Sequence, residues 1–210
     1  MRYGILSVDD DLLATSRIPA LAATHADVRP VELAALALAG ASAALLTNLL
    51  RLHLGIPGSS IIFATFPLAL GFALVPRRGA GAVMASAALV TTMGLGFAGA
   101  RIDGIGALTS LILTGPLLDL ALRSGHRGGW RLYGAFVIAG ALSNAIAFIV
   151  RGSAKALGLA GVGGGRTFGA WWPTAIATYA IAGVVAGLIS ALAWFHFRER
   201  RESSSATTAA

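Results

Sequence analysis

The ten residues RLHLGIPGSS at positions 51–60 separate two long apolar runs, 31–50 and 61–75. About twenty apolar residues in a helix, at about 1.5 Å per residue, span the roughly 30 Å hydrocarbon core of a bilayer. Pro57 has no backbone N–H to donate, and Gly58 tolerates a positive φ. The stretch therefore predicts a turn at which the chain leaves the bilayer and folds back into it.

The composition of the whole chain agrees with a membrane location. Its 210 residues are 56% hydrophobic and 12% charged, whereas soluble domains carry about 25% charged residues. The basic residues sit mainly between the apolar runs, which is typical of membrane topology and not of a nucleic-acid surface. The sequence has no cysteine, which excludes disulfides and cysteine nucleophiles. We predict an all-α, multi-pass protein of the cell (cytoplasmic) membrane, surrounded by lipid bilayer, with no nucleic-acid partner.

Six transmembrane helices are predicted from the apolar runs. Their Gly and Ala content favours a compact bundle, because small residues let helices approach closely in lipid. The second helix is short, which burial among its neighbours would allow. The predicted spans are 31–50, 60–75, 80–98, 105–122, 132–150 and 171–195. Around the transmembrane domain, 31–198, we predict a cytoplasmic amino-terminal tail without a cleavable signal peptide, 1–30, and a disordered cytoplasmic tail, 199–210.

The orientation of the bundle follows from the distribution of its 16 Lys and Arg residues. If the amino terminus is cytoplasmic, 11 of them lie on the inner side. Those on the outer side are Arg51, Arg101, Arg151, Lys155 and Arg166. Because basic segments stay inside, we predict both termini in the cytoplasm, with residues 51–60 and the long loop 151–170 facing outward.

Polar side chains within the spans concentrate toward this outer end. Asn48 ends the first span and Asn144 lies within the fifth, while Trp171 and Trp172 open the sixth. Polar groups in hydrocarbon are unfavourable unless paired, so the concentration favours a shared polar cavity that opens outward. Other interpretations stay open: hydroxyls often bond back to their own helix, and tryptophans often form an interfacial belt. Asn144 suits helix–helix contact as well as ligand contact.

The sequence contains no catalytic or metal-binding pattern. His53 has no second His nearby, and the other three are predicted on the opposite side of the membrane. Asp119 is the one acid in the middle of a span, since Glu32 lies at the first turn of the span 31–50, and Arg123 four residues on favours a local ion pair. The glycine run of GVGGGRTFGAWWP, 161–173, lacks the Lys-Ser/Thr of a phosphate loop. We therefore predict no enzyme activity, no catalytic residue, no metal and no cofactor.

These features resemble the substrate-binding S component of energy-coupling factor (ECF) type transporters. Six short Ala- and Gly-rich spans, a broken first outer loop and a long fifth loop give the overall likeness. Ala35, Ala39 and Ala43 form a ladder of small residues similar to the alanine motif with which that family docks on its coupling subunit. The stretch IPGSSIIFATFPLALGFALVPRRGAG, 56–81, is similar to the region that leads from the family's first outer loop to its third helix.

The resemblance implies the membrane-embedded substrate-capture subunit of an ECF-type ABC importer, which binds a vitamin or similar small micronutrient from the outer face. Its implied partners are a transmembrane coupling subunit, docked on the alanine ladder, and two ATPase subunits. The family's metal-transporting branch carries an early His that residues 1–3 lack, so a metal substrate is disfavoured. The residues expected around the substrate are Asn48, Arg51, His53, Pro57, Gly58, Ser59, Ser60, Asn144, Arg166, Trp171 and Trp172.

Two functions from other classes stay open on the residues alone. A helical membrane scaffold or assembly protein would use its polar residues only to hold helices together. A self-sufficient small secondary transporter is the other alternative, although the spans show neither a buried acid pair nor an inverted repeat.

Overall fold

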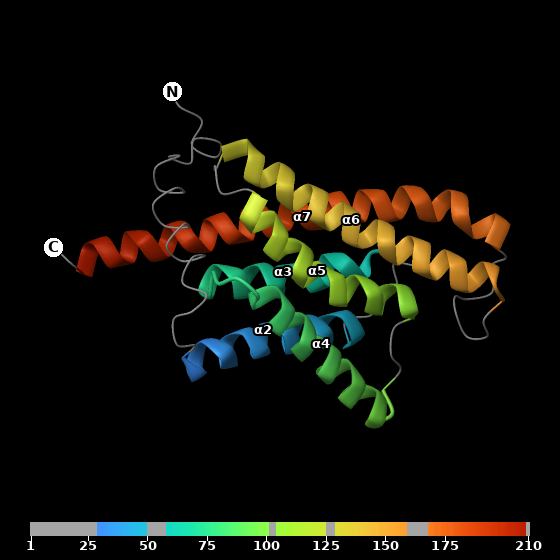
Figure 1. Cartoon of the computed structure of the whole chain (residues 1–210), viewed down its shortest axis with the longest axis horizontal. Coiled ribbons are helices and arrows are strands. Elements are labelled where there is room, and N and C mark those ends of the chain that lie inside the picture. The colour runs from blue at the N-terminus through green and yellow to red at the C-terminus, as the bar shows by residue number, and fades with distance from the viewer. Residues whose placement is uncertain (1–28, 50–57, 101–103, 125–128, 159–167, 209–210) are drawn as a thin grey trace.

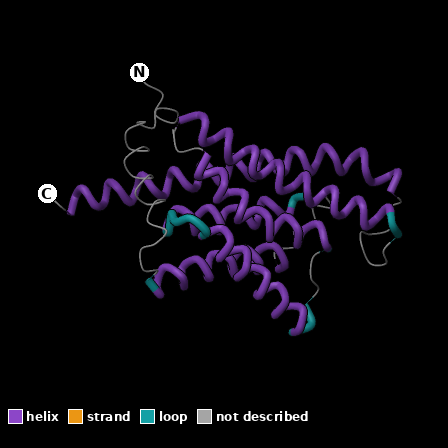
Figure 2. Tube along the Cα trace, viewed as in Figure 1, coloured by secondary structure: helices purple, strands orange, loops and turns teal. Residues whose placement is uncertain are grey.

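The computed structural model describes residues 29–49, 58–100, 104–124, 129–158 and 168–208, and in these ranges it contains helices and no strand. Successive helices run in opposite directions between the two ends of a bundle (Figure 1), and Figure 2 shows the short turns that join some of them. We call the end at which α2 starts and α7 finishes the terminal end, and the opposite end the loop end. The helices are α2 (Pro30–Leu49), α3 (Ser60–Leu74), α4 (Ala80–Phe97), α5 (Ile105–Ser124), α6 (Gly129–Ala156) and α7 (Phe168–Thr208).

Within the described residues, five helices are long and apolar enough to cross a membrane, namely α2, α4, α5, α6 and α7. This supports a multi-pass helical membrane protein. α3, which corresponds to the predicted second span, is not among these helices, because its 15 residues rise only about 22 Å. That length is short of the roughly 30 Å of a bilayer core.

α3 lies in the middle of the bundle, where α2, α4, α5 and α7 all contact it. Most of its residues are buried, and Ile61, Leu68 and Phe72 are completely so. A helix too short to span a bilayer alone is therefore enclosed by longer neighbours. The burial of this short helix among its neighbours, one of the two conditions under which its length would suit a span, is therefore present.

Glycines bring helix backbones together at two crossings. Between α6 and α7, a Cβ on Gly140 would lie 2.4 Å from the carbonyl oxygen of Gly183, and one on Gly187 would meet the α6 backbone equally closely. Between α4 and α5, a Cβ on Gly81 would lie 2.1 Å from the carbonyl oxygen of Gly115. No side chain fits at such distances, so these crossings require glycine.

The alanine ladder of α2 faces the inside of this bundle. Ala43 is fully buried in the core, and Ala35 and Ala39 are partly buried and pack against it. On the α3 side, a Cβ on Gly71 would lie 2.9 Å from the Ala39 Cβ. Ala43 thus has no surface left for the predicted docking on a coupling subunit, because the small side chains instead let α2 approach helices of the same chain.

Two carboxylates hold the turn between α3 and α4 at the terminal end. The Gly79 N–H donates to Asp119 Oδ2 on α5 at 2.7 Å. Arg77 pairs with Glu32 on α2, with 2.9 Å between Arg77 Nη2 and Glu32 Oε2. Asp119, the acid inside the fourth predicted span, therefore holds the turn between α3 and α4. Its position four residues before Arg123 did not indicate this contact.

α7 continues to Thr208, whereas the sequence analysis predicts a disordered tail from residue 199. No Gly or Pro follows Gly187 to break the helix, and the tail is rich in Ala, Arg and Glu, which favour helix. With 41 residues, α7 extends beyond the other helices at the terminal end (Figure 1). The predicted amino-terminal tail lies outside the described residues except for its last two positions.

Candidate functional site

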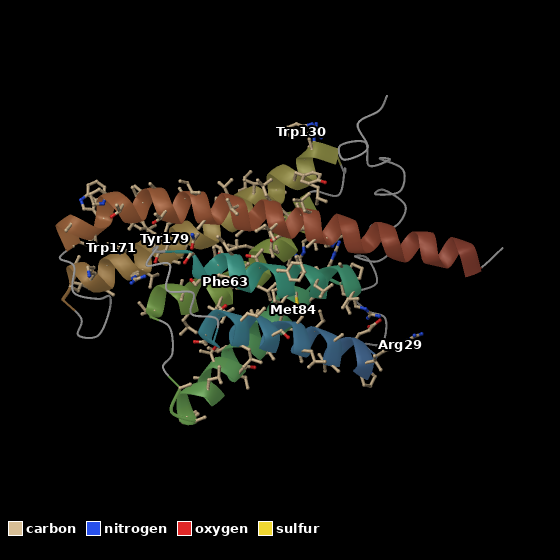
Figure 3. The ribbon with its side chains drawn as sticks, turned by 180° about the vertical axis from the view of Figure 1, so that it is seen from behind. Arg29, Phe63, Met84, Trp130, Trp171 and Tyr179 are labelled. Atoms are coloured by element: carbon tan, nitrogen blue, oxygen red, sulfur yellow. The ribbon has the colours of Figure 1, made fainter. Side chains whose placement is uncertain are left out.

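The residues predicted around a substrate belong to the loop end, and the structure describes some of them. Arg51, His53, Pro57 and Arg166 lie outside the described residues. Gly58, Asn144 and Trp171 come together around Tyr179 of α7, as the contacts below show. Figure 3 places Trp171 and Tyr179 near one another at this end, far along the bundle from Arg29.

Asn144 joins three segments of the chain. Its side chain on α6 is buried, and its Nδ2 donates to the carbonyl oxygen of Tyr179 at 2.7 Å and to that of Gly58 at 3.3 Å. Its Oδ1 accepts no hydrogen bond from any described residue. The amide nitrogen therefore makes the helix–helix contact foreseen for Asn144, while the amide oxygen is left available to a ligand.

Gly58 places the end of the first loop on α7. Its φ is +81°, which confirms the predicted turn geometry. A Cβ on Gly58 would lie 2.8 Å from Cγ of Tyr179, so the glycine backbone rests directly on the tyrosine ring. The loop therefore meets α6 through Asn144 and α7 through Tyr179.

Three aromatic side chains, Phe148, Trp171 and Tyr179, form what we call the aromatic cluster. Phe148 and Trp171 stack with ring centroids 5.6 Å apart and an interplanar angle of 17°. Tyr179 presents an edge to both rings, and such offset and edge contacts are the favoured geometries of aromatic pairs. Trp171 is only 4% exposed, and its Nε1 has no hydrogen-bond partner among the described residues.

Two cations on the last turns of α6 border this cluster. Arg151 Nη1 donates to Tyr179 Oη at 3.4 Å, and its Cζ lies 5.7 Å from the centroid of the Trp171 ring. Lys155 Nζ lies 6.0 Å from the same centroid. Both positions are within the range of cation–π attraction. Gly106, at the start of α5, packs against the Tyr179 hydroxyl, since a Cβ there would lie 3.1 Å from Tyr179 Oη.

The other predicted site residues whose positions the structure describes are not part of the aromatic cluster. Asn48 is buried and donates back to the carbonyl oxygen of Ala44 on its own helix at 2.8 Å. Trp172 is 45% exposed and faces outward, which suits the interfacial belt left open as an alternative. Ser59 and Ser60 are partly buried at the start of α3.

Most hydroxyls near the loop end bond back to a carbonyl of their own helix, which was the alternative to a shared polar cavity. Four threonines donate to a carbonyl oxygen four residues earlier on their own helix. Ser143 on α6 makes two hydroxyl contacts with α5: its Oγ lies 2.9 Å from Thr114 Oγ1 and donates to the carbonyl oxygen of Ser110 at 3.3 Å. The predicted outward polar cavity stays a prediction, and most of these hydroxyls find their partners within their own helices. The four threonines are Thr47, Thr91, Thr109 and Thr178.

The described side chains at this junction offer ring faces, hydrogen-bond donors and positive charge. Its side chains are aromatic rings, an amide and two cations, without a carboxylate, thiol or imidazole to act as base or nucleophile among the described residues at the site. Across the described residues, no group of three His, Cys, Asp or Glu side chains is placed to hold a metal ion.

Substitution of Gly58 by Ala should weaken the anchoring of the first loop. An alanine at φ +81° is strained, and its Cβ would press on the Tyr179 ring, so we expect a loss of about 1–2 kcal/mol of stability. Gly99→Ala is the matched control, because Gly99 has the same φ with nothing within 4 Å. Thermal unfolding of the two variants in detergent measures the difference, and equal losses would show that the Tyr179 contact contributes nothing.

The sequence analysis missed four residues of the site, namely Phe148, Arg151, Lys155 and Tyr179. A signal exists for Phe148, Arg151 and Lys155: they lie 4, 7 and 11 residues after Asn144, which is one face of a helix continued past residue 150.

In comparisons with family models, with curated proteins and with solved structures, the chain matches none.

Proposed function

We propose that this chain is a membrane-embedded substrate-capture subunit. It binds a small organic solute at the loop end of its bundle and serves as the membrane component of an ECF-type importer. The observation that carries the proposal is the aromatic cluster at the junction of α6, α7 and the first loop. Two of its buried polar atoms, Asn144 Oδ1 and Trp171 Nε1, have no partner among the described residues.

The composition of this junction is that of a small-molecule site. Such sites have mainly apolar and aromatic walls with a few polar groups that fix the orientation of the ligand. A buried polar atom without a hydrogen bond costs about 1–3 kcal/mol. Trp171 Nε1 makes no hydrogen bond to a described residue, so a junction that only held helices together would gain nothing from this polar atom.

A helical scaffold is the second candidate, and the glycine crossings favour it. These glycines let helices of this chain pack closely against one another, and no ligand takes part in the contact. They are Gly81, Gly115 and Gly140. The scaffold interpretation nevertheless gives no role to Asn144 Oδ1 and Trp171 Nε1 at the loop end, although Asp119 Oδ1 at the terminal end is likewise without a hydrogen bond among the described residues. Docking on a coupling subunit would have to use a surface other than buried Ala43.

Thermal unfolding of the purified protein against a panel of vitamins and vitamin precursors tests the capture proposal. A ligand present at about 100 times its dissociation constant adds about 2.7 kcal/mol to the stability of the folded state. We expect at least one compound to raise the unfolding temperature in this way. A panel without any shift would contradict capture and favour the scaffold.

Two tryptophan variants locate the binding site. Trp171→Phe should reduce the ligand-induced shift, because it removes the buried indole N–H and part of the ring. Trp130→Phe is the matched control, since Trp130 is 76% exposed at the terminal end (Figure 3). Equal shifts in both variants would place the ligand elsewhere.

Reconstitution of the chain alone into liposomes tests the importer part of the proposal. A capture subunit binds its ligand but does not accumulate it in the lumen without its ATP-driven partners. Accumulation by the chain alone would instead identify a self-sufficient transporter.

A further inference from the structure

We propose that the captured solute carries an anionic group, a carboxylate or a phosphate, and that Arg151 binds this group beside Trp171 and Lys155. The inference rests on the proposed capture function and names the chemistry of the ligand. Its basis is the kind of polar group that borders the aromatic cluster.

Arg151 is held at the cluster and is turned inward. Its partly buried side chain lies over the Trp171 ring and donates one hydrogen bond, to Tyr179 Oη. An arginine that only anchored α6 at the membrane surface would extend its guanidinium toward water and headgroups. A guanidinium has five N–H donors in a fork that matches the two oxygens of a carboxylate or phosphate. Toward the described residues, Arg151 thus has donors to spare beside the cluster.

The neighbouring polar groups are donors as well. Trp171 Nε1 is a donor only, and it is buried without an acceptor among the described residues. Lys155 adds a second positive charge within 6.0 Å of the Trp171 centroid. A ligand that supplies acceptor oxygens and negative charge matches the donors of Arg151 and Trp171, whereas a cation would be repelled by Arg151 and Lys155.

The acids with described side chains lie at the other end of the molecule. Glu32 pairs with Arg77, and Asp119 accepts from Gly79, both at the turn between α3 and α4. Arg151 therefore has no carboxylate partner among the described side chains. Because charge interactions strengthen in a low-dielectric environment, an anionic ligand is the group that this end of the bundle is suited to attract.

Matched pairs of compounds test the inference. Each acidic compound is compared with a neutral analogue: nicotinate with nicotinamide, pyridoxine 5′-phosphate with pyridoxine, and biotin with biotinamide. Thermal shift and tryptophan fluorescence titrations of the full chain in detergent measure binding. We expect at least one acidic member to bind about 10- to 100-fold more tightly than its neutral analogue, as hydrogen bonds to charged groups imply.

Variants of Arg151 assign the effect to this side chain. Arg151→Gln should weaken the acidic compound about 10- to 100-fold and leave the neutral one unchanged. Arg151→Lys, which keeps the charge but loses the fork, should retain part of the affinity and replaces Arg151→Gln if that variant does not fold. Arg131→Gln is the control, because Arg131 is an exposed arginine at the opposite end of the same helix.

The outcomes separate this inference from the capture proposal. Tighter binding of a neutral member, or unchanged binding of the acidic one by Arg151→Gln, would overturn the anionic ligand while capture stands. Absence of any binding by all six compounds would overturn both. Binding of the phosphate pair alone, or of a carboxylate pair alone, supports the inference and decides which anion the site takes.

Discussion

Gly140→Ala is expected to cost at least about 2 kcal/mol of stability, although it adds a single methyl group. A Cβ at this position would lie 2.4 Å from the carbonyl oxygen of Gly183 and 2.8 Å from the backbone nitrogen of Gly187. Neither neighbour is a side chain that could rotate away, so α6 and α7 must separate. Overpacking typically costs about 1–3 kcal/mol even where side chains can adjust, which makes this one of the largest effects expected for the chain.

The control for this prediction lies on the same helix. Gly134 has nothing within 4 Å of the position of an added Cβ, so Gly134→Ala should be neutral or stabilising by up to about 1 kcal/mol through its helix propensity. Reversible unfolding in mixed detergent and SDS micelles, followed by circular dichroism, measures both variants. Equal stability of the two variants would show that the α6–α7 crossing is looser than the structure has it.

The same comparison is available at a second crossing. On α4, Gly81 contacts the backbone of α5 whereas Gly94 has open space around it. Gly81→Ala should therefore be destabilising and Gly94→Ala should not. Agreement between the two helices would establish glycine-mediated contact as the general basis of this bundle.

The sequence predicts the helices well where glycine or proline limits an apolar run. α4 and α5 begin at the predicted residues, Ala80 and Ile105, because a glycine directly precedes each. The turn before α3 is equally clear, since Gly58 has the positive φ that its place in the quoted stretch indicated. These boundaries depend on the backbone freedom of individual glycines, and the positions of the glycines can be read directly from the sequence.

The loop-end boundary of α6 could not be predicted in this way. The apolar run stops at Val150, yet the helix continues to Ala156 and carries Arg151 and Lys155 to the aromatic cluster. Hydropathy reports where a segment meets lipid, whereas a helix ends where its backbone hydrogen bonding ends. The cations of the candidate site were therefore assigned to a loop although they lie on a helix.

The partners of individual side chains were also beyond the sequence. Trp171 is 4% exposed and Trp172 is 45% exposed, because one residue along a helix turns a side chain by about 100°. The sequence alone does not show which of the two tryptophan side chains faces inward. The alanine ladder poses the same problem, since small residues predict a close contact but not whether the contacted helix belongs to the same chain.

Asn144→Leu is expected to cost about 2–3 kcal/mol of stability and to abolish ligand-induced stabilisation. The substitution keeps the approximate volume but removes two hydrogen bonds, each worth roughly 1 kcal/mol, and leaves the Gly58 carbonyl without this donor. Ser190→Ala is the control, because among the described residues the buried Ser190 hydroxyl bonds to the carbonyl of Ala186 on its own helix, and its loss should change stability by less than about 1 kcal/mol.

Combining Asn144→Leu with Gly58→Ala tests whether the first loop is fastened through this amide. If the Asn144–Gly58 hydrogen bond holds Gly58 on the Tyr179 ring, the two substitutions break one connected contact. Their combined cost should then fall short of the sum of the separate costs by about 0.5 kcal/mol or more. Strictly additive losses would mean that the loop end of α6 and the first loop are held independently, and that the candidate site is not one unit.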